Sequence, residues 1–220
     1  MPVSRADGQV EMNQMTKLEC RMTNEGVKAF TLIELLVVIA VIAILLGLLF
    51  PAFQGVLDRV KKAQAKNDVT QIVTALNAFY TEYGKYPLTS KTSADTTYGT
   101  STTNDKLLNE LRNSGAIDNP RGIVFTSPPD AKGLTKPKSG IASAGSANAG
   151  QYFDPWGNVY FVAVDTDYDN QIDNPYTADT GAGPAKIRQG VIAWSIGKDA
   201  GPGNKGDKKF TGSDDVISWQ

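Results

Sequence analysis

The chain contains no histidine and a single cysteine among its 220 residues, and both shortages exclude functions. Without histidine there is no imidazole base, no imidazole metal ligand and no Ser-His or Cys-His nucleophile pair. Cys20 has no partner for an internal disulfide. Since no nucleophile has a visible base, we do not expect an enzyme.

An excess of charge of either sign is also lacking, because 22 Lys and Arg residues face 23 Asp and Glu residues. This balance gives no reason to expect a nucleic-acid partner or an acidic substrate. A basic run over residues 59–66 follows an apolar segment, and we expect it to meet lipid headgroups or the acids of a neighbouring subunit.

A long apolar segment, KAFTLIELLVVIAVIAILLGLLFPAF, is the most conspicuous feature that is present. From Leu35 to Phe53 it carries no charge, and at about 1.5 Å per residue this run is roughly 28 Å long, close to the bilayer's hydrocarbon thickness. No A-x-A cleavage site follows, so the pattern predicts a retained membrane-spanning helix. Glu34 stands at its edge, where an unpaired carboxylate costs free energy in lipid.

A different pattern follows Pro51, at which we expect a kink or a break just before it. Apolar residues recur there at steps of three and four, with charged residues between them, which indicates an amphipathic helix that ends at Gly84, with Pro87 beyond it. The apolar positions of this face are Phe53, Val56, Leu57, Val60, Ala63, Val69, Ile72, Val73, Leu76, Phe79 and Tyr80.

The remaining sequence predicts short elements separated by long loops. A short helix over 104–115 would begin at the cap Asn104 and stop at Gly115. The predicted strands are 159–164, 190–196 and 215–219, and the predicted loops are 89–103 and 126–150. The fold class is therefore α+β: a long N-terminal helix, membrane-spanning in its first half and amphipathic in its second, packed on a small antiparallel sheet with long loops.

The segment KAFTLIELLVVIAVIAIL resembles the N-terminus of type IV pilins and of the pseudopilins of type II secretion. In that family a peptidase cuts on the cytoplasmic side before a phenylalanine and then methylates the new N-terminus. The resemblance implies cleavage between Ala29 and Phe30, methylation of Phe30, and Glu34 as fifth residue of the mature chain. Ala29 stands where glycine is usual, and because alanine is also small we expect cleavage to proceed. Pro51 falls where many members have a helix-breaking proline.

The resemblance also implies an organisation into four parts. They are a cleaved leader (1–29), a hydrophobic transmembrane and polymerisation helix (30–53), its amphipathic continuation (54–84) and a periplasmic globular α+β domain with acidic loops (85–220). In a filament the Glu34 carboxylate would pair with the amino terminus of Phe30 on a neighbouring subunit, so that a charge unpaired in the isolated subunit guides assembly. The alternative is that Glu34 reaches the lipid headgroups.

The C-terminal half resembles the major pseudopilin more than a type IV pilin. DPWGNVYFVAV and AWSIGKDAGPGNKGDKKFTGSDDVISW are similar to that family's D-P-W-G strand and its calcium loop. Type IV pilins commonly close this region with a disulfide, which this chain cannot form. The resemblance implies calcium ligands at Asp199, Asp214 and Asp215 and at the carbonyl of Ile196. A solvated acidic turn is the alternative.

A second acidic stretch, DTDYDNQID, has the spacing of an EF-hand loop. Asn170 replaces the glycine of position 6, although asparagine tolerates a left-handed backbone, and Tyr176 replaces the glutamate of position 12. A weak calcium site and a bare acidic turn both remain open. The candidate ligands are Asp165, Asp167, Asp169, Gln171 and Asp173.

We therefore expect a structural filament subunit similar to the major pseudopilin, held in the inner membrane by a single pass and assembled into a periplasmic pseudopilus that supports protein export. Its expected partners are copies of itself, minor pseudopilins, the prepilin peptidase, an inner-membrane assembly platform and membrane lipid. One alternative is a type IV pilin of a surface or DNA-uptake filament. Another is a signal-anchored binding domain that does not polymerise.

Overall fold

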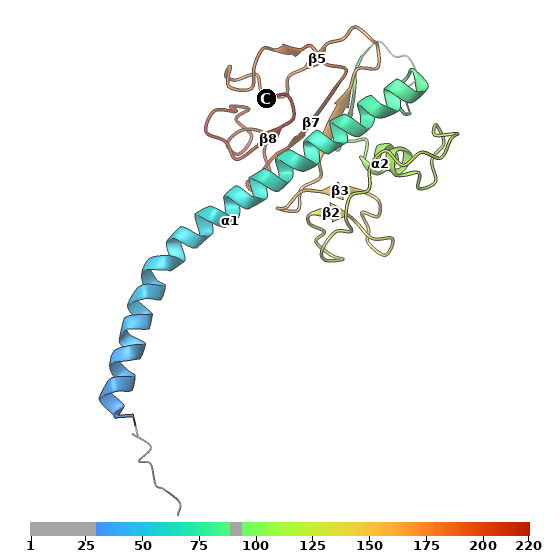
Figure 1. Cartoon of the computed structure of the whole chain (residues 1–220). Coiled ribbons are helices and arrows are strands. Elements are labelled where there is room, and N and C mark those ends of the chain that lie inside the picture. The colour runs from blue at the N-terminus through green and yellow to red at the C-terminus, as the bar shows by residue number, and fades with distance from the viewer. Residues whose placement is uncertain (1–29, 89–93) are drawn as a thin grey trace, which may run out of the picture. The chain divides into compact units, whose positions relative to one another are not determined.

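One long helix, α1 (Leu32–Tyr83), begins the structure, a computed structural model that describes residues 30–88 and 94–220, without the side chains of residues 48–54 (Figure 1). Of the two alternatives expected at Pro51, the break is wrong, since α1 continues past that residue, and the kink stays a prediction. A proline removes one backbone hydrogen bond, and the bonds on either side suffice to continue the helix. The chain divides at Phe50 and Pro51 into two compact units.

The first unit contributes the apolar start of α1. Every large apolar side chain from Phe30 to Leu46 is exposed. The leader and Ala29 lie outside the described residues. Among the residues that are described, no helix is both long and apolar enough to span a membrane. The expected span, Leu35–Phe53, includes side chains beyond residue 47 that are not described.

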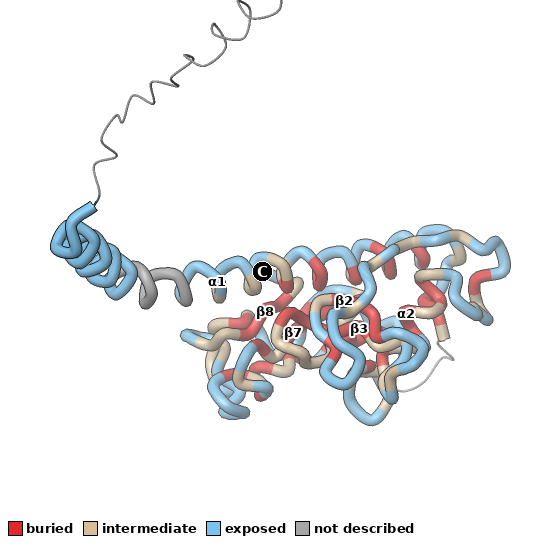
Figure 2. Tube along the Cα trace, turned by 90° about the horizontal axis from the view of Figure 1, so that it is seen from below, coloured by how far each residue is buried: buried red, intermediate tan, exposed pale blue. Residues whose placement is uncertain are grey.

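In the second unit, one face of α1 is buried against the sheets and loops (Figure 2). This face confirms the predicted spacing, because Val69, Ile72, Leu76 and Phe79 are all nearly inaccessible. Burying one such side chain stabilises the fold by roughly 1.5–3 kcal/mol.

The predicted packing face is wrong in its first turns, where Val56, Leu57 and Val60 are 55%, 46% and 59% exposed. There α1 meets the described remainder of the unit through the polar groups of Asp58 and Lys62 instead. These apolar side chains therefore have no described layer against which to pack.

The main sheet is antiparallel and has the strand order β1-β4-β7-β8. Its strands are β1 (Thr96–Tyr98), β4 (Phe161–Val164), β7 (Val191–Ser195) and β8 (Val216–Ile217). The central register pairs Phe161 with Trp194 and Val164 with Val191. The three predicted strands are thus confirmed, each shorter than expected, whereas β1 lies in a stretch that we predicted to be loop.

Both faces of this sheet are buried. On β4, Val162 and Val164 pack with α1, while Ala163 packs with Ile192 and Trp194 on the opposite face. Segments that follow β4 and precede β8 cover this second face. Burial on both sides explains why the central strand β4 is apolar throughout instead of alternating with polar residues.

The smaller elements complete the second unit. They are α2 (Asp105–Arg112), the pair β2 (Gly140–Ile141) with β3 (Tyr152–Phe153), and the pair β5 (Ile172–Asp173) with β6 (Lys186–Ile187). The helix α2 is capped at its C-terminus by Asn113, which adopts the left-handed conformation (φ 54°) and lies two residues before the predicted stop at Gly115.

Asn104 is not the side-chain cap that we predicted for α2. Its buried amide donates to the carbonyls of Tyr152 (3.2 Å) and Tyr160 (2.8 Å) and accepts from the N–H of Tyr152 (3.1 Å). The side chain thereby satisfies backbone groups of the strands, because a buried polar group needs partners and the strands offer them.

Candidate functional site

The start of α1 is closed by a reciprocal contact between Thr31 and Glu34. The carboxylate of Glu34 accepts from the N–H (2.9 Å) and hydroxyl (2.8 Å) of Thr31, and the N–H of Glu34 donates to that hydroxyl (3.3 Å). This is a capping box, which the T-x-x-E spacing before an apolar run could have revealed. The carboxylate of Glu34 therefore has neutral hydrogen-bond donors within its own helix. The pairing of its charge with the amino terminus of Phe30 on a neighbouring subunit stays a prediction.

The predicted C-terminal acidic cluster is assembled by the loop between β7 and β8. Asp199, Asp214 and Asp215 each offer a carboxylate oxygen, and these oxygens lie within 4.8 Å of one another. Backbone amides hold all three in place. Asp199 accepts from the N–H of Lys205 at 2.7 Å, Asp215 from that of Gly203 at 2.6 Å, and Asp214 from that of Lys198. The loop is therefore folded around its carboxylates.

The three acids differ in burial, since the Asp215 side chain is only 6% exposed whereas Asp214 and Asp199 are more exposed. Oδ1 of Asp215 has no hydrogen-bond partner in the part of the chain that is described. Burial, with the charges of Asp214 and Asp199, raises the pKa of Asp215 to about 6. Three carboxylates without nitrogen or sulfur ligands suit a hard cation such as Ca²⁺. Ile196, half-buried, directly precedes this loop.

A turn that begins at Asp154 anchors the loop. Asp154 Oδ1 accepts from the backbone N–H groups of Trp156 (2.9 Å), Gly157 (2.7 Å) and Asn158 (2.8 Å). The amide of Asn158 donates to the carbonyl of Gly197 at 2.6 Å, where the acidic loop begins. The DPWG turn thereby positions the entrance to the cluster.

The basic residues of α1 bind the other end of the loop. Lys62 donates to the carbonyl of Ser213 (3.1 Å), and Lys66 donates to the carbonyls of Ile217 (2.8 Å) and Gln220. Partial burial lowers the pKa of Lys66. Two members of the basic run therefore contact the C-terminal segment of their own chain.

The EF-hand-like loop is assembled only in part. Asp165 and Asp167 come together, but with Asp95 as the third carboxylate. Asp169 accepts from the N–H of Gln171 at 2.8 Å, and Asp173 pairs with Lys186 at 2.7 Å. The backbone at Asn170 is left-handed (φ 60°), as its place in the loop predicted.

Sequence reasoning missed Asp95 because it lies far from the loop in the chain. Only the pairing of β1 with β4 brings it there.

Comparison with known proteins agrees with the N-terminal features. The family described as the prokaryotic N-terminal methylation motif matches residues 26–50. The fimbrial protein EcpC of Eikenella corrodens is 31% identical over 133 residues, which cover 60% of this chain and 82% of that protein. A fimbrial protein of Pseudomonas aeruginosa is 37% identical over 99 residues, covering 44% of this chain and 64% of its own.

A type II secretion protein is similar as well. The type II secretion system core protein G of Klebsiella michiganensis is 29% identical over 70 residues, covering 32% of this chain and 49% of that protein. No solved structure matches the chain. From its methylation motif and its similarity to these proteins, the chain belongs to the type IV pilin-like family, which includes both fimbrial and type II secretion proteins.

Proposed function

We propose that this chain is a structural filament subunit, similar to the major pseudopilin, that polymerises through its N-terminal helix into the periplasmic pseudopilus of a type II secretion-type machine. The observation that carries the proposal is the methylation motif over residues 26–50, within which α1 begins and exposes all its large apolar side chains as far as Leu46. Such a surface needs lipid or other apolar helices to cover it.

In this proposal lipid covers the apolar helix before assembly, and neighbouring subunits cover it afterwards. Before assembly the subunit is held in the inner membrane by one pass, with its C-terminal domain in the periplasm. The prepilin peptidase cleaves between Ala29 and Phe30 and methylates Phe30. On assembly, guided by an inner-membrane platform and minor pseudopilins, the exposed helix packs against its copies.

Glu34 changes partners in this scheme. In the single chain its carboxylate accepts hydrogen bonds from Thr31. In the filament the amino terminus of Phe30 on a neighbouring copy supplies a positive charge, and an ion pair in an apolar surrounding is stronger than one in water. Pro51 lies within α1, and a part for this residue in assembly belongs to the proposal.

The acidic cluster favours secretion over a surface pilus. A mature chain without cysteine needs another link to hold its long C-terminal loop, and Ca²⁺ bound by Asp199, Asp214 and Asp215 would provide one. The unpartnered Oδ1 of buried Asp215 fits such a ligand. Bound Ca²⁺ would supply positive charge that connects β7 to β8.

A type IV pilin is the second candidate, because the relatives in Eikenella corrodens and Pseudomonas aeruginosa are named fimbrial proteins. Deleting the gene in its source organism separates the two. A secretion subunit predicts fewer proteins in the medium with surface filaments intact. A pilin predicts lost surface filaments with normal secretion, and this result would overturn our first proposal.

A test of polymerisation itself uses cysteines placed one at a time between residues 30 and 50. Oxidation should give ladders of covalent oligomers in native membranes, because packed helices bring equivalent positions of neighbouring copies together. Exclusively monomeric bands at every position would favour a signal-anchored domain that does not polymerise.

A further inference from the structure

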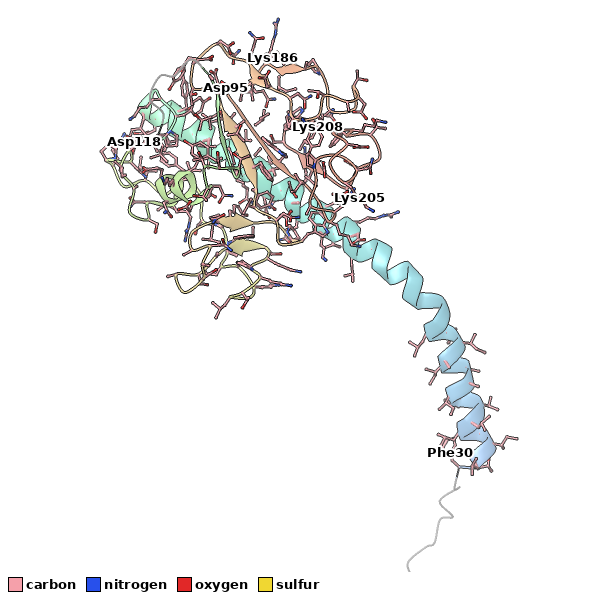
Figure 3. All side chains as sticks on the ribbon, turned by 180° about the vertical axis from the view of Figure 1, so that it is seen from behind. Phe30, Asp95, Asp118, Lys186, Lys205 and Lys208 are labelled. Atoms are coloured by element: carbon pink, nitrogen blue, oxygen red, sulfur yellow. The ribbon has the colours of Figure 1, made fainter. Side chains whose placement is uncertain are left out.

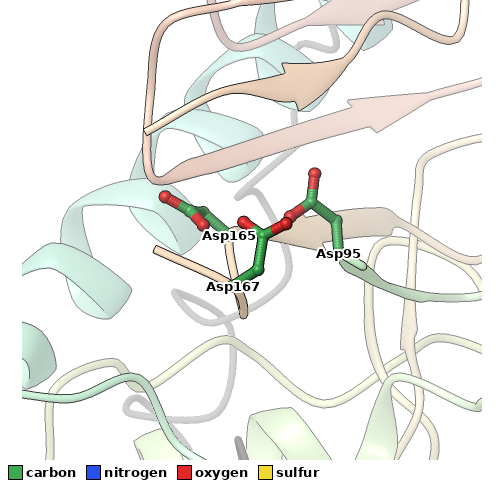
Figure 4. Close-up of side chains that lie close together, drawn as sticks. All are labelled: Asp95, Asp165 and Asp167. Atoms are coloured by element: carbon green, nitrogen blue, oxygen red, sulfur yellow. The ribbon is translucent and has the colours of Figure 1, made fainter. Parts of the chain in front are cut away.

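A second carboxylate cluster lies where strand β1 begins and strand β4 ends. Asp95, Asp165 and Asp167 each offer one oxygen, and these oxygens lie within 4.8 Å of one another. The carboxylate of Asp167 stands between the other two (Figure 4). Figure 3 shows Asp95 well apart from Lys205, whose backbone N–H contacts the C-terminal cluster. The two groups of acids are therefore separate.

The sheet register explains why two of these acids meet. β1 and β4 are antiparallel, and Thr96 pairs with Val164 at the last step of their ladder. One residue further along, Asp95 comes opposite Asp165. Like charges placed directly opposite each other on neighbouring strands destabilise a sheet. With Asp167 added, this end of the sheet gathers three negative groups that repel one another.

Two of the oxygens have no donor. Asp165 is only 3% exposed, and its Oδ2 accepts from the N–H of Asn170 at 2.8 Å. Within the described part of the chain, Oδ1 of Asp165 and Oδ1 of Asp95 are inaccessible and without a hydrogen-bond partner. A buried carboxylate oxygen in this condition costs free energy unless a cation binds it.

The neighbouring lysine is engaged elsewhere. Lys186 pairs at 2.7 Å with Asp173, whose side chain is 81% exposed, and is not the counter-charge within the cluster. Its charge and that of Asp95 do influence each other, since Asp95 is among the groups that raise the pKa of Lys186.

Local contacts hold the cluster in shape. The Thr166 hydroxyl donates to the carbonyl of Ala94 at 2.7 Å, which fixes the chain beside Asp95 against the loop after β4. The same loop turns sharply, with positive φ at Tyr168 (62°) and Asn170 (60°). Asp167 accepts from the N–H of Asp169 at 3.2 Å. The carboxylates are thus gathered before any ligand arrives.

We propose that Asp95, Asp165 and Asp167 bind a divalent cation, Ca²⁺, that joins the start of β1 to the loop after β4. Ca²⁺ accepts carboxylate oxygens in flexible geometry and completes its coordination with water, which suits two half-buried acids and one buried acid. The site differs from a contiguous EF-hand loop because one ligand comes from a distant segment and Asp173 is not in it. Its effect is to fix an edge strand of only three residues.

Hydrogen–deuterium exchange on the full chain in detergent tests this proposal. With saturating Ca²⁺, the amides of residues 94–98 and 165–171 should exchange at least about tenfold more slowly than with a chelator. Asp95→Asn should abolish this protection. Asp169→Asn, which removes the same charge from the same loop outside the cluster, should retain it. Peptides from 197–215 report the C-terminal cluster independently in the same samples.

Two results would overturn the site. One is amide exchange at residues 94–98 that does not respond to Ca²⁺ in the wild-type chain, whether or not exchange at residues 197–215 responds. The other is full protection in Asp95→Asn, which would place the ion elsewhere. If Asp95→Asn alters exchange throughout the second unit, Asp167→Asn is used in its place. Asp167 is half-buried and lies in a loop, and its substitution should likewise abolish the Ca²⁺-dependent protection.

Discussion

The hydroxyl of Ser195 donates a 2.6 Å hydrogen bond to Oδ2 of Asp154, and both side chains are completely inaccessible to solvent. The contact joins the last residue of β7 to the turn between β3 and β4. Because Asp154 Oδ1 also accepts three backbone N–H bonds, one carboxylate organises both the turn and the entrance to the acidic loop.

Asp154→Ala should destabilise the second unit severely. The change leaves one hydroxyl and three backbone donors without their acceptor, at about 1–3 kcal/mol for each buried group, so we expect a loss of at least about 3 kcal/mol. Urea unfolding followed by near-ultraviolet circular dichroism measures it. Ser195→Ala, which removes one of the four bonds, should cost only about 1–2 kcal/mol. Equal losses for both variants would show that the turn does not depend on Asp154.

Acid should weaken the contact of Asp118 with the segment after α1. Asp118 accepts from Lys85 at 2.9 Å and from the N–H of Leu88 at 2.7 Å, and the bond to Lys85 contributes most to lowering its pKa below the usual 3.8. A carboxylate with a lowered pKa stabilises the fold above its unfolded pKa, and this contribution is lost as pH falls through the folded pKa.

The measurement compares urea midpoints of the wild-type chain and Asp118→Asn. Wild type should be the more stable at neutral pH, and the difference should disappear below the folded pKa of Asp118. A difference that stays constant down to that pH would mean that the side-chain shape, and not its charge, provides the stability.

Filament assembly should distinguish the two partners of Glu34. Glu34→Gln retains a capping oxygen but removes the charge, so we expect a decrease in filament yield of about tenfold or more, which corresponds to roughly 1.4 kcal/mol for one lost interaction. Thr31→Ala removes the hydroxyl of the capping box but keeps the backbone N–H donor and the charge of Glu34, and its yield should stay near that of wild type. Sheared filament fractions, quantified against total membrane-bound protein, give the yields. A low yield for Thr31→Ala together with a near-wild-type yield for Glu34→Gln would instead identify the capping box as the feature that assembly requires.

Calcium removal should lower the melting temperature. At a Ca²⁺ concentration of about 100 times Kd, binding to the folded state adds about 2.7 kcal/mol, and this corresponds to roughly 5–10 °C for a unit of this size. Asp214→Asn should reduce the Ca²⁺-dependent rise, while Asp207→Asn, a change of the same charge in the same loop, should not. An identical rise in both variants would place Ca²⁺ binding outside the C-terminal cluster.

The sequence predicted those parts of the fold that depend on local patterns. Ile72, Leu76 and Phe79 could be assigned to a core because helical spacing fixes which residues share a face. The exposure of Val56 could not be predicted, because it depends on how far the sheet and loops extend along α1.

The acidic clusters likewise include residues that the sequence could predict and one that it could not. Asp199, Asp214 and Asp215 follow from a motif read along the chain, and the structure brings them together as expected. Asp95 is separated from Asp165 by about half of the domain, and its place opposite that residue depends on a strand of three residues that the polar composition did not reveal.

Asn104 has a consequence for how this domain can vary. Its amide fixes the start of α2 to Tyr152 and Tyr160, on either side of the DPWG turn. The chain between α2 and Tyr152 therefore leaves and returns at points fixed by one side chain. Insertions or deletions near the exposed Gly145 can change the length and the surface of this connecting segment without moving the helix or the strands. Related subunits could thus present different outer surfaces on one unchanged scaffold.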